Sequence, residues 1–272
     1  TDITDKNLLD QFFDKHKINI IFNAAAFKHV PIFEDNPYSG FKNNVLGCNN
    51  LVQKAIEKNI DKFILVSSDK AVNPTNLMGV SKRICEAIVA NAKSIDCDTI
   101  FLSTRFGNVL DSSGSVVPTF KSQIAKGGPI TITDLKIERY FMTIPEASKL
   151  VLEASRIGTD SQIYVFDMGA PVKIYDLAKK MLLLSGLSEI DVPIVETGLR
   201  KGEKLYEELF LDSEIIGKSL ENPKILMGKK IDLSINQRKS LEQLISIFEN
   251  SQIDQFNEFD VKSIVPQYNK QS

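Results

Sequence analysis

The stretch Phe63-Ile64-Leu65-Val66-Ser67-Ser68-Asp69-Lys70 decides the fold. Its four apolar residues predict a strand that is buried on both faces, as in parallel sheets that are covered by helices. An acid and an amine follow directly, at the carboxyl end of this predicted strand. Open α/β sheets bind their ligands at that end of the strands, so we expect Asp69 and Lys70 to lie in a functional site together with Ser67 and Ser68.

The segments around this stretch alternate between strand and helix patterns. Apolar runs predict further strands at 18–22 and 99–103, and apolar residues at helical spacing predict helices at about 38–58 and 78–92. Alternation at these lengths indicates βαβ units and a parallel sheet. The predicted fold class is α/β, with a Rossmann-like, doubly wound parallel sheet.

After residue 108 the pattern changes, because loops that contain glycine and serine become frequent. Further elements are predicted at 116–126, 145–154, 163–168 (a strand), 176–185 and 236–248. We interpret residues 1–110 as an incomplete dinucleotide-binding Rossmann domain and residues 111–272 as a smaller α+β substrate-binding domain. A segment near 161–185 is expected to return to the Rossmann sheet.

The usual phosphate-binding turn of a dinucleotide-binding sheet is missing from this sequence. That turn reads Gly-x-Gly-x-x-Gly and places the pyrophosphate at a helix N-terminus. None of the 14 glycines forms this pattern. We therefore expect the Rossmann domain to lack its first βαβ elements, which would precede Thr1.

Composition narrows the range of functions. The net charge of −2 provides no general attraction for nucleic acid. Cys48, Cys85 and Cys97 have no metal-ligand spacing, so no metal site is expected and a reducing compartment is indicated. No apolar run reaches the roughly 18–20 residues of a membrane helix. These features favour a cytoplasmic protein.

Met78 and Lys82 are four residues apart and therefore share one face of the predicted helix. Their spacing resembles the Tyr-x-x-x-Lys pair of short-chain dehydrogenases, with methionine in place of tyrosine. The alternatives are ordinary ones: Met78 could fill the core, Lys82 could be a solvated helix lysine, and Asp69-Lys70 could be a surface ion pair or a helix cap.

Several longer motifs carry a closer resemblance. They are Ala24-Ala25-Ala26-Phe27-Lys28-His29-Val30-Pro31, Asn43-Asn44-Val45-Leu46-Gly47, Ser68-Asp69-Lys70-Ala71-Val72-Asn73-Pro74-Thr75-Asn76, Arg105-Phe106-Gly107-Asn108-Val109-Leu110, Glu138-Arg139-Tyr140-Phe141-Met142-Thr143-Ile144-Pro145-Glu146-Ala147 and Gly202-Glu203-Lys204-Leu205-Tyr206-Glu207-Glu208-Leu209. With these motifs the chain resembles the extended short-chain dehydrogenase/reductases of bacterial polysaccharide biosynthesis. More closely, it is similar to the UDP-N-acetylglucosamine 4,6-dehydratases of capsule, O-antigen and protein-glycosylation pathways.

The resemblance implies NAD as cofactor and a reaction without net oxidation. Hydride leaves carbon 4 of the sugar and returns at carbon 6, and one water is lost in between. Lys70 would be the base at carbon 5 and Asp69 the acid at the carbon 6 hydroxyl. Their ordinary pKa values, about 10.4 and 3.9, are wrong for these roles near neutrality, so the closed site must lower the first and raise the second, and the pair is expected to titrate as a unit.

Met78 cannot accept the proton of the carbon 4 hydroxyl, because a thioether has no basic oxygen. Ser68, Asp69 or a water molecule remain candidates for that acceptor. The resemblance places Lys82 on the nicotinamide ribose. Further cofactor contacts are implied for Asp2, Ile3, Ala24, Ala25, Ala26, Lys28, Asn44, Ser67 and Phe106.

The substrate side is implied by the same resemblance. His29 would border the sugar, although a lone histidine is more often structural. Asn108, Arg139 and Arg200 would hold the two phosphates, since a guanidinium matches phosphate oxygens, and Glu203 would bind the uridine ribose. Lys201 stands where the family has proline. Three other arginines are expected to be structural: Arg83, Arg105 and Arg156.

Two other functions stay open. A UDP-sugar epimerase could use the same fold, although such enzymes usually keep the tyrosine that Met78 replaces. A UDP-sugar-binding remnant or half of a split enzyme would explain the missing glycine turn. The resemblance further implies a homo-oligomer that pairs through the helices of Asn44 and Met78. It also implies a parent protein with a further N-terminal portion, in some relatives membrane-anchored at the cytoplasmic face.

Overall fold

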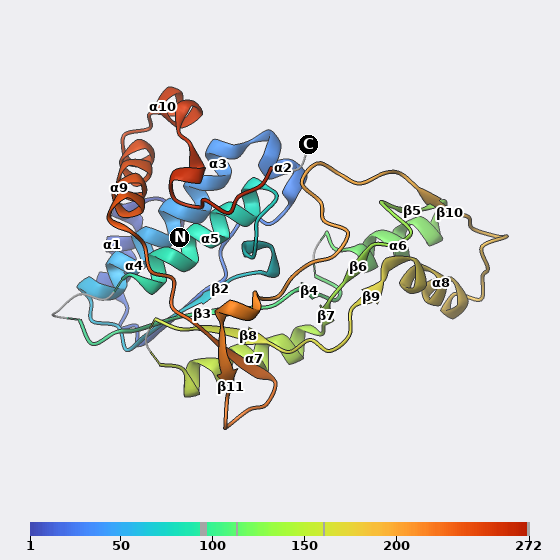
Figure 1. Cartoon of the computed structure of the whole chain (residues 1–272), viewed down its shortest axis with the longest axis horizontal. Coiled ribbons are helices and arrows are strands. Elements are labelled where there is room, and N and C mark those ends of the chain that lie inside the picture. Colours follow the sequence, from blue (N-terminus) through green and yellow to red (C-terminus); the bar gives the residue numbers. More distant parts are fainter. Residues whose placement is uncertain (93–96, 113, 160, 271–272) are drawn as a thin grey trace.

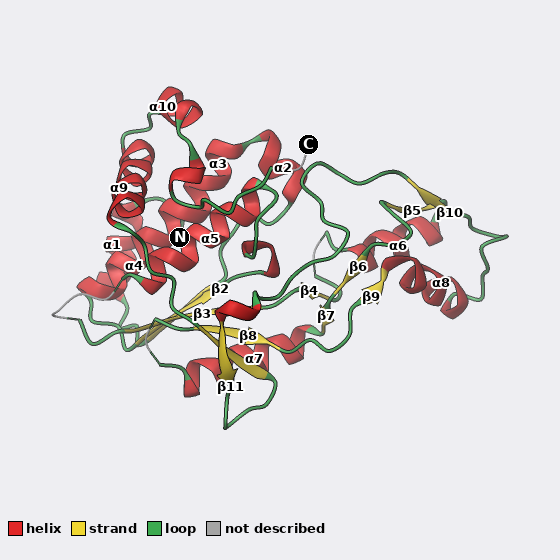
Figure 2. Ribbon diagram, viewed as in Figure 1, coloured by secondary structure: helices red, strands yellow, loops and turns green. Residues whose placement is uncertain are grey.

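The computed structural model describes residues 1–92, 97–112, 114–159 and 161–270. Its centre is a six-stranded sheet in the order β1-β2-β3-β8-β12-β11 (Figures 1 and 2). In that order the strands span Ile20–Asn23, Lys62–Val66, Ile100–Arg105, Ile163–Phe166, Ile225–Gly228 and Ile215–Lys218. The first four strands run parallel, which confirms the α/β class, while β12 and β11 add an antiparallel edge that the alternating pattern did not predict.

Strand β2 shows why the sheet must be covered on both faces. Successive side chains of a strand point to opposite faces. Phe63 and Leu65 pack into a core with helices α1, α4 and α5, whereas Ile64 packs into a second core with α7 on the other face (Figure 2). These helices span Lys6–Lys15, Gly47–Glu57, Leu77–Ala90 and Ile144–Ile157. The doubly wound arrangement follows from this unbroken apolar strand.

The helix predicted at 38–58 is interrupted. It consists of α3 (Pro37–Phe41), a π-helical turn (Lys42–Leu46) and α4. Such turns with an extra residue are frequent at functional sites. Here the turn carries Asn44, whose amide bonds both the backbone N–H and the carbonyl of Phe27, at 2.7 and 3.1 Å. It thereby fixes the loop between β1 and the short helix α2 (Val30–Asp35).

A smaller part of the molecule has its own core (Figure 1, right). Phe120, Ile130, Ile174 and Leu182 pack together there. The elements of this part are α6 (Val116–Ala125), β5 (Ile130–Ile132), α8 (Ile174–Leu184) and β10 (Ile194–Glu196). Four two-residue strands link it to the sheet: β4 (Asn108–Val109), β6 (Glu138–Arg139), β7 (Phe141–Met142) and β9 (Val172–Lys173).

The end of the chain returns to the first half. Helices α9 (Ile235–Glu249) and α10 (Ile253–Glu258) pack on α3 and the π-helical turn (Figure 1). Phe256 lies 5.5 and 5.6 Å from the rings of Tyr38 and Phe41, measured between ring centroids. The range 111–272 therefore does not form one spatial unit, and part of the helical layer through which pairing was expected is covered within the chain.

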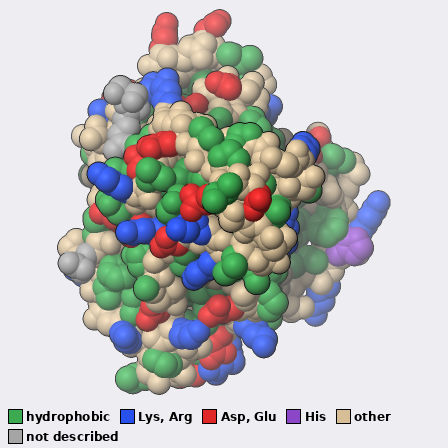
Figure 3. All heavy atoms as spheres, turned by 90° about the vertical axis from the view of Figure 1, so that its right-hand side faces the viewer, with side chains coloured by type: hydrophobic (Ala, Val, Ile, Leu, Met, Phe, Trp, Pro, Cys, Tyr) green, Lys and Arg blue, Asp and Glu red, His purple; other side chains and the backbone are tan. Residues whose placement is uncertain are grey.

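On the face shown in Figure 3, basic and acidic side chains are interspersed rather than separated by sign. This agrees with a net charge near zero. Within the described ranges, no helix combines the length and apolar character needed to cross a membrane.

Candidate active site

The acid–amine pair lies directly after β2, as the sequence predicts. Asp69 begins a short 3-10 helix that spans Asp69–Ala71, and Ser68 caps its N-terminus. The backbone N–H of Asp69 donates to the carbonyl of Phe106 at 3.1 Å, which ties the turn to the segment after β3. Asp69 is 1% exposed, so its carboxylate lies at the floor of the site.

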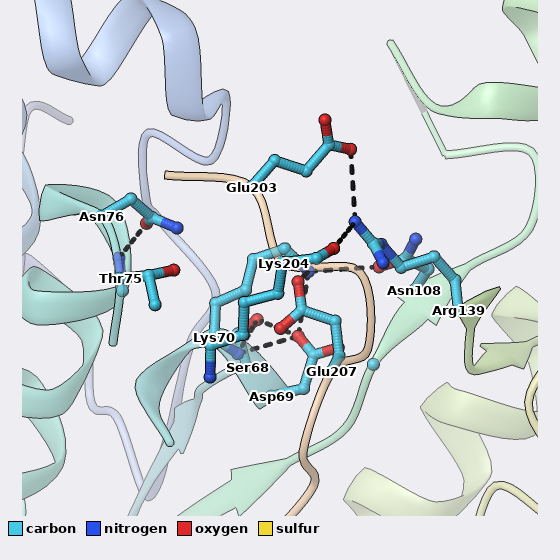
Figure 4. Close-up of polar contacts among 12 residues, drawn as sticks. Ser68, Asp69, Lys70, Thr75, Asn76, Asn108, Arg139, Glu203, Lys204 and Glu207 are labelled. Atoms are coloured by element: carbon cyan, nitrogen blue, oxygen red, sulfur yellow. Dashed lines mark hydrogen bonds and ion pairs between the residues drawn. The ribbon is translucent and has the colours of Figure 1, made fainter. Parts of the chain in front are cut away.

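The two oxygens of Asp69 differ in their surroundings. Oδ1 accepts hydrogen bonds from Ser68 Oγ at 2.8 Å, from the Lys70 backbone N–H at 2.9 Å and from Lys70 Nζ at 3.1 Å (Figure 4). Oδ2 is buried and has no hydrogen-bond partner among the residues that the structure describes. One oxygen therefore orients the carboxylate, while the other is left unsatisfied.

Lys70 Nζ lies among three oxygen-bearing side chains. Besides Asp69 it contacts Asn108 Oδ1 at 3.3 Å and Glu207 Oε1 at 3.6 Å (Figure 4). Burial alone would lower the pKa of the Lys70 amine, but the carboxylates of Asp69 and Glu207 outweigh burial and raise this pKa above its ordinary value. The ion pair thus outweighs desolvation in setting the pKa of Lys70.

Helix α5 supplies the second half of the site. Met78 is buried beside the pocket, and Lys82 Nζ donates to the carbonyl of Val66 at 2.9 Å. Burial lowers the pKa of Lys82 below its ordinary value. The residue between them matters too, because a Cβ at Gly79 would lie 2.2 Å from the Lys70 carbonyl oxygen. Only glycine lets the Asp69–Lys70 turn pack this closely against α5.

The segment at 199–208 closes the other side. Thr75 Oγ1 and Asn76 Nδ2 both donate to the carbonyl of Gly202, at 2.9 and 3.0 Å. Asn76 also caps α5 through the backbone N–H of Gly79 at 2.8 Å. One asparagine therefore joins the first turn of α5 to the segment that carries Arg200, Glu203 and Glu207.

Arg139 is fully engaged with protein groups at its two terminal nitrogens. It donates to the carbonyls of Glu138, Lys204 and Leu205 at 2.7, 2.9 and 3.2 Å, and to Glu203 Oε1 at 3.2 Å. It is 6% exposed, whereas Arg200 is exposed. Arg139 thus clamps the 199–208 segment, and the guanidinium that faces open space is that of Arg200.

Most of the predicted site residues line one cavity of about 500 Å³. They are Ala24, Ala26, Lys28, His29, Ser67, Ser68, Lys70, Met78, Lys82, Phe106, Asn108, Arg139, Arg200 and Glu203. Asp69 lies beneath this lining. The cavity is bounded by the carboxyl ends of β1, β2 and β3 and by the smaller part of the molecule.

Four predicted cofactor residues do not line the cavity. Asp2 Oδ1 instead accepts hydrogen bonds from the backbone N–H of Thr4 at 2.8 Å and from the Thr4 hydroxyl at 2.9 Å. The side chain of Ile3 occupies the space where a Cβ of Gly47 would lie. The backbone N–H of Ala25 donates to Asn23 Oδ1 at 3.2 Å. Asn44 acts from behind, through the backbone of Phe27.

Glu207, Thr75 and Asn76 were not singled out from the sequence, although each lies within a quoted motif. Glu207 and Glu208 are adjacent and alike in the sequence, yet Glu207 is 8% exposed and faces Lys70, while Glu208 bonds Lys204 Nζ at 3.1 Å at the surface. A buried acid beside an exposed one has no sequence signal of its own here. Only the turn geometry distinguishes them.

The three arginines that were expected to be structural behave so. Arg105 and Arg83 join Glu86 and Glu214 in a buried ionic cluster, and Arg156 makes surface ion pairs with Glu153 and Glu221. In the described part of the chain, no group of three or more His, Cys, Asp or Glu side chains is placed to hold a metal ion.

The sheet and its two helical layers define a Rossmann-like α/β fold. Residues 1–230 match the family model described as "Polysaccharide biosynthesis protein". The chain belongs to this family.

Named relatives point the same way. The chain is 48% identical over 231 residues to the probable polysaccharide biosynthesis protein EpsC of Bacillus subtilis, covering 85% of this chain and 38% of EpsC. It is 44% identical over 254 residues to the capsular polysaccharide biosynthesis protein CapD of Staphylococcus aureus, covering 93% of this chain and 42% of CapD. The chain thus spans about two fifths of the length of these relatives.

Other similar proteins are named as sugar-nucleotide epimerases or as sugar-nucleotide dehydratases. A protein named UDP-glucose 4-epimerase from Rickettsia rickettsii is 37% identical over 202 residues, covering 74% of this chain and 58% of that protein. Pen from Bacillus thuringiensis superposes with a TM-score of 0.78 at 31% identity, covering 87% of this chain and 72% of Pen. The dTDP-glucose 4,6-dehydratase DesIV from Streptomyces venezuelae shares the fold, with a TM-score of 0.69 at 19% identity and coverage of 77% and 69%.

Proposed function

We propose that this chain carries the catalytic site of an NAD-dependent 4,6-dehydratase for a UDP-N-acetylhexosamine, with UDP-N-acetylglucosamine as substrate. The observation that carries this proposal is the Asp69–Lys70 pair at the floor of the cavity, with Met78 where a tyrosine would otherwise lie. An acid and a base on adjacent residues are what loss of water across carbon 5 and carbon 6 requires. A methionine cannot provide the phenol that epimerases of this fold use.

The cavity fits the nicotinamide half of NAD. Small side chains, Ala24 and Ala26, border it at the end of β1, and Phe106 and Met78 add flat or flexible apolar surface. Lys82, buried beside them, can reach a ribose hydroxyl once its bond to the Val66 carbonyl is shared. When bound, NAD supplies the reversible hydride acceptor for the sugar.

The protein groups then handle the protons. The ion pair first shifts its proton from Lys70 Nζ to Asp69 Oδ1 along their 3.1 Å hydrogen bond. Neutral Lys70 then takes the proton from carbon 5 at Nζ, and protonated Asp69 gives its proton to the carbon 6 hydroxyl, which leaves as water. Lys70 Nζ returns its proton to carbon 5 when hydride adds to carbon 6, and the proton released from the carbon 4 hydroxyl replaces the one that the pair gave to the water.

The UDP half requires cationic and polar groups on the far side of the cavity. Arg200 has an exposed guanidinium there, and Asn108 and the clamped Arg139 border the same space. Glu203 holds the backbone N–H of Arg200 at 3.2 Å as well as Arg139. We propose that the diphosphate binds Arg200, while Glu203 keeps this loop in place beside the uridine ribose.

The test is a mass-spectrometric assay of the chain with NAD and UDP-N-acetylglucosamine. Dehydration produces a nucleotide sugar lighter by one water. A product of unchanged mass but altered stereochemistry would instead support an epimerase, which the name of the Rickettsia relative favours.

A binding assay separates the third possibility. Titration with NAD is expected to give saturable binding in the micromolar range. If UDP-sugar binds and NAD does not, the chain alone is a UDP-sugar-binding module, and the dehydratase proposal for this polypeptide is wrong.

A further inference from the structure

Glu207 is an ionisable residue of the site to which neither the motifs nor the proposed reaction gives a role. Its side chain is 4% exposed, and Oε1 lies 3.6 Å from Lys70 Nζ. Its other oxygen, Oε2, is buried, and no hydrogen-bond partner for it occurs in residues 1–92, 97–112, 114–159 or 161–270. A buried carboxylate with a free oxygen is costly unless a nearby cation compensates it.

The charged groups that face Lys70 come from four segments. Asp69 precedes it in the same turn, Glu207 reaches it from the 199–208 segment, and Arg139 approaches from β6 (Figure 4). Lys82 lines the same cavity from α5. Arg139, which pairs with Glu203 at 3.2 Å, acts to lower the pKa of Lys70, but the carboxylates of Asp69 and Glu207 outweigh it.

Glu207 acts on the pair through Lys70. Its negative charge, 3.6 Å from Nζ, stabilises a cation on Lys70. This makes it harder to remove the last proton that Asp69 and Lys70 share. The ion pair and the protonated acid with a neutral amine hold the same number of protons, so either form keeps this proton.

We infer that Glu207 is a positioning residue whose carboxylate keeps the single transferable proton on the Asp69–Lys70 pair. Without it, the pair would lose this proton at lower pH and leave a deprotonated Asp69 that cannot protonate a leaving hydroxyl. The assignment rests on the proposed function for its chemical purpose. The charge effect on Lys70 itself does not, because it can be measured without NAD or substrate.

The experiment is competitive labelling of lysine amines in the ligand-free chain with trace acetic anhydride over a pH series, read by mass spectrometry. In the wild type, the labelling midpoint of Lys70 is expected above the ordinary lysine value of about 10.4. Glu207→Gln keeps the size and polarity of the side chain but removes its charge. We expect it to lower the Lys70 midpoint by about one pH unit or more, as for loss of an opposite charge within about 4–6 Å.

The matched control is Glu208→Gln, which removes the neighbouring, exposed carboxylate and should leave the Lys70 midpoint unchanged. Lys82 reports on folding in the same spectra, because its midpoint lies below the ordinary value only while it is buried. If Glu207→Gln unfolds the chain, Glu207→Asp is used instead. Its side chain is one methylene shorter, so the carboxylate lies farther from Lys70 and should lower the labelling midpoint of Lys70 by less than Glu207→Gln would.

An unchanged Lys70 midpoint in folded Glu207→Gln, or in Glu207→Asp where that variant is needed, overturns the inference. An equal shift in Glu208→Gln overturns it as well. Absence of dehydration with a normal Lys70 shift would count against the proposed function alone.

Discussion

Two buried ionic clusters lie within the same half of the molecule, and they are built differently. In the structural cluster, Arg105 and Glu86 are 1% and 0% exposed, and both oxygens of Glu86 are bonded. In the site cluster, Asp69 and Glu207 each keep one buried oxygen that no described residue bonds. The acceptors of Glu86 in the first cluster are thus satisfied by protein groups, whereas the second cluster keeps carboxylate oxygens that can accept further hydrogen bonds.

The two clusters differ because one contains an arginine at its centre and the other a lysine. Arg105 has a rigid fork of donors, which reaches Glu86, Glu214 and the Leu209 carbonyl at once. Lys70 lines the cavity with a single nitrogen, which can lose its proton. The arginine bonds hold β3, α5 and the segment before β11 together. In the site cluster, a lysine lies beside two carboxylates, each with one oxygen that no described residue bonds, and can exchange protons with them.

The largest expected effect tests the lysine. Lys70→Arg keeps the positive charge between Asp69 and Glu207, but a guanidinium does not deprotonate in proteins. We expect dehydration to fall by about 10²–10⁴-fold, the usual contribution of a general base, with little change in the thermal unfolding midpoint. Activity near the wild-type level would show that Lys70 is not the base.

The second effect tests the arginine. Arg105→Met removes the shared partner of Glu86 and Glu214 and leaves the buried Glu86 with a more distant cation, Arg83 at 3.4 Å. The free energy of unfolding should fall by about 3–5 kcal/mol, the typical cost of breaking a buried ion pair, as measured by urea denaturation. Arg156→Met is the control, because its ion pairs are at the surface and should contribute less than about 1 kcal/mol. Equal effects of both substitutions would contradict the comparison.

The contribution of the structural cluster to the free energy of unfolding should depend on pH through Glu214. Burial alone would raise the pKa of Glu214, but the guanidiniums of Arg105 and Arg83 outweigh it and lower this pKa below its ordinary value. A lowered pKa means that the stabilisation is complete above the ordinary value and is lost as pH falls through the value in the folded state. Glu214→Gln should therefore cost about 1–2 kcal/mol near neutrality, and this gap should narrow in urea titrations as pH is lowered below about 4.5. A gap that widens on acidification would refute the assigned sign.

The smallest effect concerns the residue that joins the site to its covering segment. Asn76→Ala removes the α5 cap and the bond to Gly202, and should cost about 1–2 kcal/mol of unfolding free energy. Asn76→Asp keeps the oxygen that caps Gly79 but loses the amide donor. It should retain most of the stability and still loosen 199–208, as seen by faster limited proteolysis there. Identical proteolysis of wild type and Asn76→Asp would exclude this role.

The sequence predicts the elements that repeat a strong local pattern. Buried strands such as Phe63–Val66 and amphipathic helices such as 78–92 are found within a few residues of their predicted ends. The interruption of the helix at 38–58 could not be predicted, because the apolar spacing continues across Lys42–Leu46, and the contacts that Asn44 makes from this turn with Phe27 and Ser81 join distant parts of the sequence.

The antiparallel edge was missed for a related reason. Strands β11 and β12 are short, and β12 owes its place to β8, which lies about 60 residues earlier in the chain. At the site, Asp69, Lys70, Met78 and Lys82 follow from strand and helix registers. Glu207 does not, since it reaches Lys70 from an irregular segment that Thr75, Asn76 and Arg139 hold in place.

The packing of α10 on Tyr38 and Phe41 has a consequence for synthesis on the ribosome. The first helical layer is made early, but its apolar surface is completed only by Phe248 and Phe256 and by the residues up to Tyr268. Contacts between such distant parts of a chain form late and slow folding. A nascent chain that stops before α9 would expose that surface, and truncation before α9 should therefore cause aggregation during synthesis.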